Sequence, residues 1–334
     1  MKKVFGLFLS LMVLIGLSAC EPETPGNSKK PDSEESLCLT FVSSGESTIA
    51  LIKEGEPFEI TLEYSVDGDV WEPYTIGETL ALVDGGELMF RAGEDRNDKF
   101  SAGYDDYYRF VISGKVDSKG NVMSLLDRDC KADSAPEAGF IYLFANCDGL
   151  VSAPVLPAKN LAAGCYLAMF AGCTSLTKAP ALPATELAAS CYLGMFNGCT
   201  GLTEAPELPA MKLVPSCYSN MFTYCTSLTK APALPATGLA EGCYFSMFNG
   251  CTNLTEAPVL PATELAESCY SNMFDGCTSL NYVKALFTDK PSKESTKNWL
   301  RNVSHTGTFV KSKDATWDVR GSNGIPEGWT VVIE

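Results

Sequence analysis

The most regular feature of this 334-residue chain is a pattern of apolar positions that returns every 26 residues between 139 and 280. Each copy carries a Cys-Tyr pair, then Met-Phe, then Cys-Thr, at intervals of four residues, followed by a leucine and two prolines. The Cys-Tyr pair recurs at 165, 191, 217, 243 and 269 without insertion or deletion. A fixed period of this length is typical of a solenoid, because one unit is too short to bury its own apolar face and must stack on the next.

Within one copy, residues 176–183 are expected to form the extended part. Pro180 and Pro183 lack the N–H group that a regular central strand requires. We therefore predict a strand of only two or three residues, flanked by chain of polyproline type.

The Cys-Tyr to Cys-Thr part of each copy reads as helical. Leu187, Cys191 and Met195 follow at i, i+4 and i+8, which places them on one face of a helix. The helix is predicted to start near 188–189 in this copy and at 214–215 in the next, where Pro215 suits the first helical position. Phe196 is the expected core anchor, and Gly198 the expected left-handed helix terminus.

The regions on either side of the repeats differ in pattern. Residues 38–130 show short apolar runs separated by turn signals such as Asp67-Gly68 and Gly85-Gly86, which predicts a β-sandwich domain. Residues 130–138 read as a linker, and 281–334 as a C-terminal cap on the last repeat. The predicted fold class is α+β: an N-terminal β-sandwich followed by a short leucine-rich-repeat solenoid, residues 139–280, with that cap.

The N-terminus has the features of an export signal. Lys2 and Lys3 precede an apolar stretch that is too short to span a membrane. The stretch ends in Leu17-Ser18-Ala19-Cys20, which resembles a bacterial lipobox. We predict a lipoprotein signal peptide over 1–19, lipid attachment at Cys20 and a disordered tether over 20–37, with a plain secretory signal as the alternative. The chain would then be exported and lipid-anchored at the outer membrane and cell surface, held there by its N-terminal lipid only.

Composition and charge exclude several functions. Asp and Glu number 41 against 25 Lys and Arg, a formal net charge of −16, which disfavours nucleic-acid binding. The single histidine, His305, leaves no multi-histidine metal site and little scope for a catalytic triad. The sequence marks no catalytic residue, metal ligand or cofactor site, and we expect a protein that is not an enzyme.

The 14 cysteines are interpreted mainly as structural. Free cysteine behaves as a small apolar residue, so the repeat cysteines are expected to be stacked, buried thiols. A zinc array is disfavoured because the paired cysteines lie eight residues apart. Cys38 and Cys130 bracket the first domain, and either a disulfide or two thiols fits that placement.

Two kinds of position could carry recognition. The first is a column of alternating charge at equivalent places in successive copies, which could equally be an exposed stabilising ladder. The second comprises variable positions in the Cys-Tyr to Cys-Thr part, which could equally serve packing between copies. The candidate binding face drawn from both is Lys178, Glu204, Tyr224, Lys230, Phe245 and Glu256.

The phrase Met-Phe-x-x-Cys-Thr-x-Leu-Thr-x-Ala-Pro-x-Leu-Pro in 139–280 resembles the BspA-type leucine-rich repeats of surface proteins from Bacteroides and related anaerobes. In that family the usual phrase is closer to Ala-Phe-x-x-Cys-x-x-Leu followed by Ile-Pro, so Met replaces Ala here and the unit is longer. The flanks 38–130 and 298–329 resemble those of such proteins as well. The resemblance implies surface attachment and adhesion, mostly to host proteins, and no chemistry.

The expected function is therefore that of a lipid-anchored cell-surface binding or adhesion protein. Its expected partner is an extracellular protein, of the host matrix or of a cell surface, bound through the repeat solenoid. The alternative is a glycan-binding lipoprotein of a polysaccharide-capture system, since aromatic residues of the first domain could stack on sugars. Those residues are Trp71, Tyr74, Tyr104, Tyr107 and Tyr108.

Overall fold

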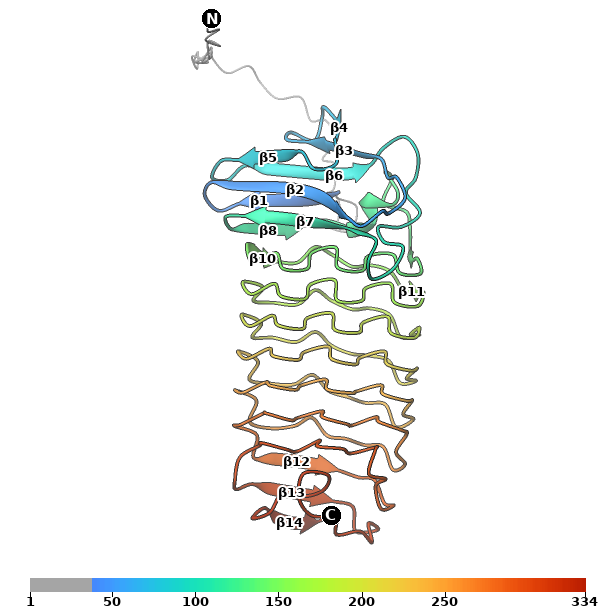
Figure 1. Ribbon diagram of the computed structural model, residues 1–334, viewed down its shortest axis with the longest axis vertical. Helices are drawn as coiled ribbons and strands as arrows, with labels where there is room; N and C mark the ends of the chain where they lie inside the picture. The colour runs from blue at the N-terminus through green and yellow to red at the C-terminus, as the bar shows by residue number, and fades with distance from the viewer. Residues whose placement is uncertain (1–37) are drawn as a thin grey trace, which may run out of the picture. The chain divides into compact units, whose positions relative to one another are not determined.

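In the computed structural model, residues 38–334 are described, and they form a β-solenoid of about 8 turns (Figure 1). The predicted signal peptide, the lipid-attachment residue Cys20 and the predicted tether lie outside the described residues. By their own contacts, the described residues belong to one compact unit.

The N-terminal strands form two sheets. The larger sheet has the strand order β10-β8-β1-β6-β3-β4, and the smaller has the order β5-β2-β7. Their bounds are β1 Leu39–Ser43, β2 Ser47–Glu54, β3 Leu62–Ser65, β4 Glu72–Pro73, β5 Thr79–Leu82, β6 Glu87–Ala92, β7 Tyr107–Ser113, β8 Val116–Lys119 and β10 Leu150–Ser152.

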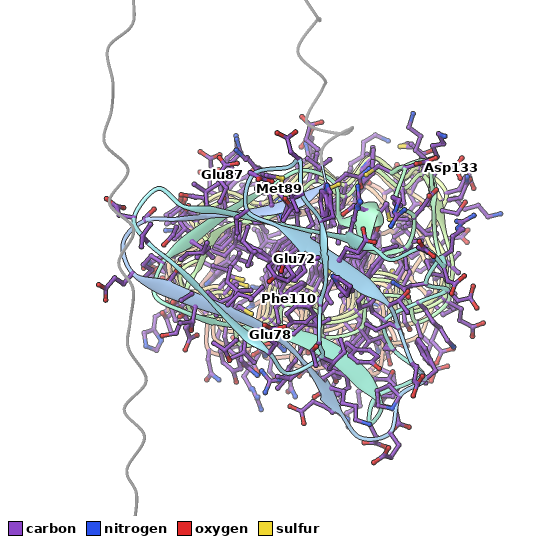
Figure 2. All side chains as sticks on the ribbon, turned by 90° about the horizontal axis from the view of Figure 1, so that it is seen from above. Glu72, Glu78, Glu87, Met89, Phe110 and Asp133 are labelled. Atoms are coloured by element: carbon purple, nitrogen blue, oxygen red, sulfur yellow. The ribbon has the colours of Figure 1, made fainter. Side chains whose placement is uncertain are left out.

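These sheets continue into the repeats, so the predicted β-sandwich domain is not supported. Strand β10, which belongs to the first turn of the solenoid, pairs in parallel with β8. Phe110 of β7 stacks on Phe144 of the first turn, with ring centroids 5.2 Å apart. Seen along the stack, Phe110 lies near the centre while Glu87 and Asp133 lie at the rim (Figure 2). One apolar core runs from Leu39 to Trp329, because an open solenoid end would otherwise expose it.

The predicted linker also takes part in the stack. Within it, β9 (Ser134–Ala135) pairs in parallel with β11 (Asn160–Leu161) of the next turn. A short 3₁₀-helix, η2 (Val122–Leu125), precedes the linker, and the side chain of Asn121 caps it by accepting a hydrogen bond from the Met123 N–H.

The prediction of a helix in each copy is wrong. Among residues 38–334 no α-helix is present, and the α+β class is replaced by an all-β solenoid. In place of the helix, each copy has consecutive four-residue turns. In the first full copy the third residue of each turn, Gly164, Ala168 or Gly172, has a positive φ. Gly198 is left-handed as predicted, with φ +74°, but it lies in a turn and not at a helix end.

Backbone hydrogen bonding explains why turns replace the helix. The N–H of Met169 donates to the Tyr166 carbonyl and closes a turn within the copy. The N–H groups of Tyr166, Ala168 and Phe170 instead donate to the next copy, at 2.8–3.0 Å. Alternate N–H groups thus serve the turn and the stack. The apolar spacing of four that suggested a helix is the spacing of these turns.

Because the hydrogen bonds fix the register, each side chain lies over its counterpart 26 residues away. The phenylalanine column from Phe110 to Phe274 has ring centroids 5.2–5.7 Å apart and nearly parallel planes. Phe196, the predicted core anchor, is fully buried in it. A second column begins with Phe100 stacked on Phe140 of the degenerate first copy, continues through five tyrosines and ends on Trp299.

The predicted cap, residues 281–334, extends the stack. Strands β12 (Tyr282–Ala285), β13 (Thr308–Lys311) and β14 (Thr330–Ile333) form a parallel sheet in consecutive turns. Trp299 occupies the place of the repeat tyrosine, and its indole N–H donates to the Gly324 carbonyl.

The repeat cysteines are buried thiols, as predicted. One column donates its S–H groups to the phenylalanine carbonyls of the preceding turn, as Cys173 does to Phe144, at 3.0–3.1 Å. Burial raises the pKa of Cys199 and of Cys251 to about 12. The buried cysteines are Cys147, Cys165, Cys173, Cys191, Cys199, Cys217, Cys225, Cys243, Cys251, Cys269 and Cys277.

We expect the solenoid to lose stability steeply above pH 9. Unfolded thiols ionise near their ordinary pKa of about 9, whereas the buried ones stay protonated until about pH 12. Their contribution to stability is complete below pH 9 and is lost as the pH rises towards 12. Each such thiol removes about 1.4 kcal/mol of unfolding free energy per pH unit in that interval.

Urea unfolding at pH 7.5 and pH 10, under reducing conditions, measures this loss. The variant Cys199→Ala serves as the control, because it removes one titrating thiol and should lower the pH slope by about 1.4 kcal/mol per unit. An unfolding free energy that is equal at the two pH values would contradict the buried-thiol assignment.

Candidate functional site

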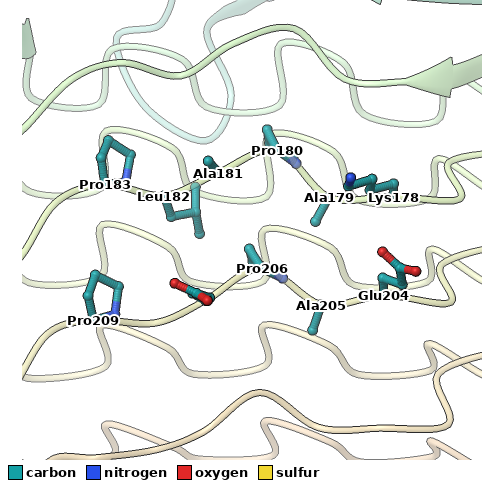
Figure 3. Close-up of a pocket in the computed structure, with 11 residues that line it drawn as sticks. Lys178, Ala179, Pro180, Ala181, Leu182, Pro183, Glu204, Ala205, Pro206 and Pro209 are labelled. Carbon is teal, nitrogen blue, oxygen red and sulfur yellow. The ribbon is translucent and has the colours of Figure 1, made fainter.

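The extended segments of successive turns form one surface, which we call the proline face: residues 177–183, 203–209, 229–235 and 255–261. Side chains alternate along each segment. In the first, Lys178, Ala181 and Pro183 are exposed, whereas Ala179 and Leu182 are buried in the core. Figure 3 shows two of these segments one above the other, with the stepped turn segments behind them. Backbone pairing between these segments is sparse, as we predicted from their prolines. An isolated β-bridge joins Lys178 to Glu204.

The proline face is hollowed between successive turns. A cavity of about 360 Å³ lies between segments 178–183 and 204–209. A larger cavity of about 670 Å³ lies between segments 203–209 and 230–235. Because both are lined by Glu204, Ala205, Pro206, Glu207 and Pro209, they form one groove that crosses three turns.

Four of the predicted site residues form one column on the proline face, and three of them, Lys178, Glu204 and Lys230, line the groove. Lys178, Glu204, Lys230 and Glu256 are all exposed and occupy the same place in consecutive turns. Within the described part of the chain, none of the four takes part in an ion pair. Their charges therefore face solvent, those of Lys178, Glu204 and Lys230 at the groove and that of Glu256 in the following turn.

The other two predicted residues lie elsewhere. Tyr224 and Phe245 belong to turn segments, so the structure does not bring them together with the charged column. Tyr224 is 57% exposed and has a φ of 58°. Its ring covers Gly250, where a Cβ atom would come within 2.4 Å of a ring carbon, which explains the glycine. Phe245 is half-buried.

The aromatic residues that could stack on sugars do not form one exposed cluster either. Tyr74 and Tyr108 are buried, and the Arg91 guanidinium lies 3.8 Å from the centre of the Trp71 ring. Tyr104 is 61% exposed, and Tyr107 has its ring centroid 5.0 Å from that of Tyr142.

Sequence reasoning missed Tyr142 and Glu207. Tyr142 stands at a left-handed turn position, φ 59°, of the degenerate first copy, where the repeat normally carries a small or polar residue. Glu207 interrupts a column of alanine and valine on the proline face. Comparison of copies at those positions would have identified both residues.

Two other classes of site have no support in residues 38–334. No group of three or more His, Cys, Asp or Glu side chains is placed to hold a metal ion. None of the helical segments in this range is long and apolar enough to cross a membrane.

Comparison with known proteins adds no assignment: no protein-family model, curated protein or solved structure matches the chain.

Among residues 38–334, Cys38 and Cys130 are the cysteines outside the buried columns, and both are half-buried. Their side chains hydrogen-bond to each other, which lowers the pKa of Cys38 and raises that of Cys130. The thiolate, which is the nucleophile in disulfide exchange, therefore forms more readily at Cys38.

We expect oxidised glutathione to link Cys38 to Cys130. The Cys38 thiolate would displace one glutathione, and the Cys130 thiolate would then displace the second, leaving a protein lighter by two hydrogens. Intact-mass measurement reads this out. In the variant Cys130→Ser, the reaction should stop with one glutathione attached to Cys38. Stable glutathione adducts on both cysteines of the unaltered chain would contradict the expectation.

Proposed function

We propose that this chain is a lipid-anchored cell-surface binding protein, without catalytic activity, that recognises another protein through its proline face. The observation that carries the proposal is the groove that crosses three turns. It is bordered by the charges of Lys178, Glu204 and Lys230, which have no ion-pair partner among residues 38–334.

The composition of the groove suits binding. Proline fixes its own φ, and alanine and proline side chains lose little rotamer freedom when buried. Each extended segment is held by the turn segments beside it, so the surface is formed before a partner arrives. A preformed surface lowers the entropic cost of association.

The charged column adds selectivity. Charges at the rim of an interface steer approach and reject partners of the wrong pattern more than they add affinity. Two positive and two negative groups alternate here, so the face as a whole carries little net charge in this column. A partner is therefore selected by the order of its charges and not by its total charge.

Attachment to a surface is supported by the lipobox-like Leu17-Ser18-Ala19-Cys20. The resemblance to BspA-type repeats supports adhesion to an extracellular protein of the host matrix or of a neighbouring cell. A rigid stack of turns that carries its groove along one side suits a protein that acts by contact.

A binding screen tests the proposal. Residues 33–334 would be offered immobilised host matrix proteins and, in parallel, soluble polysaccharides. For a matrix protein that binds, Ala233→Lys should weaken binding at least about tenfold, because it places a charged chain in the larger cavity. The matched control is Ala163→Lys, at an exposed alanine outside the cavities. Equal effects of the two substitutions would contradict recognition by the proline face.

Glycan binding is the second candidate function, favoured by the cluster of Tyr104, Tyr107 and Tyr142. Exposed tyrosine rings can stack on sugars, and Asp105 beside them offers a carboxylate for hydroxyl groups. If a polysaccharide binds in the screen, Tyr104→Ala should abolish that binding while Ala233→Lys leaves it unchanged. Retention of binding by Tyr104→Ala would exclude this cluster as the site.

A further inference from the structure

The charged column on the proline face alternates in sign, so its order is reversed in sign when the column is read from the opposite end. Along the stack, Lys178, Glu204, Lys230 and Glu256 read positive, negative, positive, negative. Read from the other end, the same column gives negative, positive, negative, positive. A second copy turned end over end therefore presents the opposite sign at every position.

We propose that the proline face binds a second copy of this chain in antiparallel orientation, related by a two-fold axis that passes between the turns of Glu204 and Lys230. The inference rests on the proposed function, because it names a partner for the same face. A two-fold contact of this kind brings one surface patch against itself.

The rotation pairs all four charges. Lys178 faces Glu256 of the second copy, and Glu204 faces Lys230 of the second copy, with the reciprocal pairs following by symmetry. These groups have no ion-pair partner within residues 38–334 that they would have to give up. A shift of one turn would place lysine opposite lysine and glutamate opposite glutamate, so the charges also select the register.

Side-chain size follows the same rule in the neighbouring exposed column. That column reads Ala181, Glu207, Ala233 and Val259. The rotation places Val259, which is 49% exposed, opposite Ala181, and Glu207 opposite Ala233. Each larger side chain thus meets an alanine, and two bulky groups do not collide.

The position of the axis matches the shape of the face. The larger cavity, about 670 Å³, is lined by segments 203–209 and 230–235, which are the two turns on either side of the axis. Glu207 lines that cavity, and so does Ala233. The most hollowed part of each face would therefore lie at the centre of the contact, where Glu207 of one copy meets Ala233 of the other.

The arrangement also suits adhesion between cells. Strand β1 lies towards one end of the stack and β14 at the other (Figure 1). Antiparallel copies would place their N-terminal ends at opposite ends of the pair. If Cys20 carries the lipid, the two anchors would then be directed towards two facing surfaces.

The test uses two charge-reversal variants of residues 33–334, Glu204→Lys and Lys230→Glu. Each variant alone places like charges opposite each other at two places, and each should dimerise at least about tenfold more weakly than the unaltered chain. Mixed together, the two variants are complementary at all four positions. Sedimentation velocity should therefore show a heterodimer on mixing and monomers for each variant alone.

The double variant Glu204→Lys/Lys230→Glu distinguishes this proposal from an alternative in which the alternating charges only stabilise neighbouring turns of the same chain. Its charge order is positive, positive, negative, negative, which is still complementary under the rotation but no longer alternates between neighbouring turns. We expect the double variant to dimerise like the unaltered chain. If the charges served only neighbouring turns of one chain, the double variant would lose thermal stability and gain no self-association.

Three results would overturn the proposal. The first is an unaltered chain that stays monomeric at about 100 µM, a concentration at which even a weak interface associates. The second is a dimer that the single charge reversals leave intact. The third is the absence of a heterodimer when the two variants are mixed. Failure of the proposed function is distinguishable from these results. If the chain is monomeric but binds a matrix protein, and Ala233→Lys weakens that binding, only the proposed function stands. If the chain dimerises but binds no matrix protein, only the proposed self-association stands.

Discussion

Alternate N–H groups of each turn segment donate to the carbonyl groups of the next turn, and the rest of the structure depends on this division. The bonds from Tyr166, Ala168 and Phe170 to the following copy fix the register between turns. Once the register is fixed, every residue must lie over its counterpart 26 positions away. The chain therefore consists of columns, and each column must be compatible with itself at the separation of adjacent turns.

The columns of the core show what such compatibility requires. Flat aromatic rings can repeat at 5.2–5.7 Å with nearly parallel planes, as the phenylalanine column does. Cysteine repeats because its small S–H group fits beside the rings and donates to the phenylalanine carbonyl of the preceding turn. The N-terminal sheets and the C-terminal strands satisfy the same condition: Phe110 and Trp299 continue the aromatic columns and cover their ends.

On the outer surface the same register produces a different result. Identical charges in one column would repel each other across each turn, and the alternation of lysine and glutamate from 178 to 256 avoids this. Because proline interrupts pairing between the extended segments, hollows remain between turns, and the charges border them. An alternating column on such a face is complementary to its own reversed copy, which connects the internal repeat to the proposed association between chains.

The period, the stacking of like residues, the buried thiols and the burial of Phe196 all follow from the amino-acid sequence, because a repeat without insertions leaves a unit no other way to bury its apolar side chains. The sequence also placed the charged residues in one column. The sequence did not distinguish a helix from consecutive turns, since both put Leu187, Cys191 and Met195 on one side. The folded chain makes the distinction, because alternate N–H groups that a helix would satisfy internally are bonded to the neighbouring turn. Folding also joins the N-terminal sheets to the first turn of the solenoid, through the pairing of β8 with β10 and the stacking of Phe110 on Phe144. It separates Tyr224 and Phe245 from the charged column, because these two residues lie in turn segments and the charged residues in extended segments.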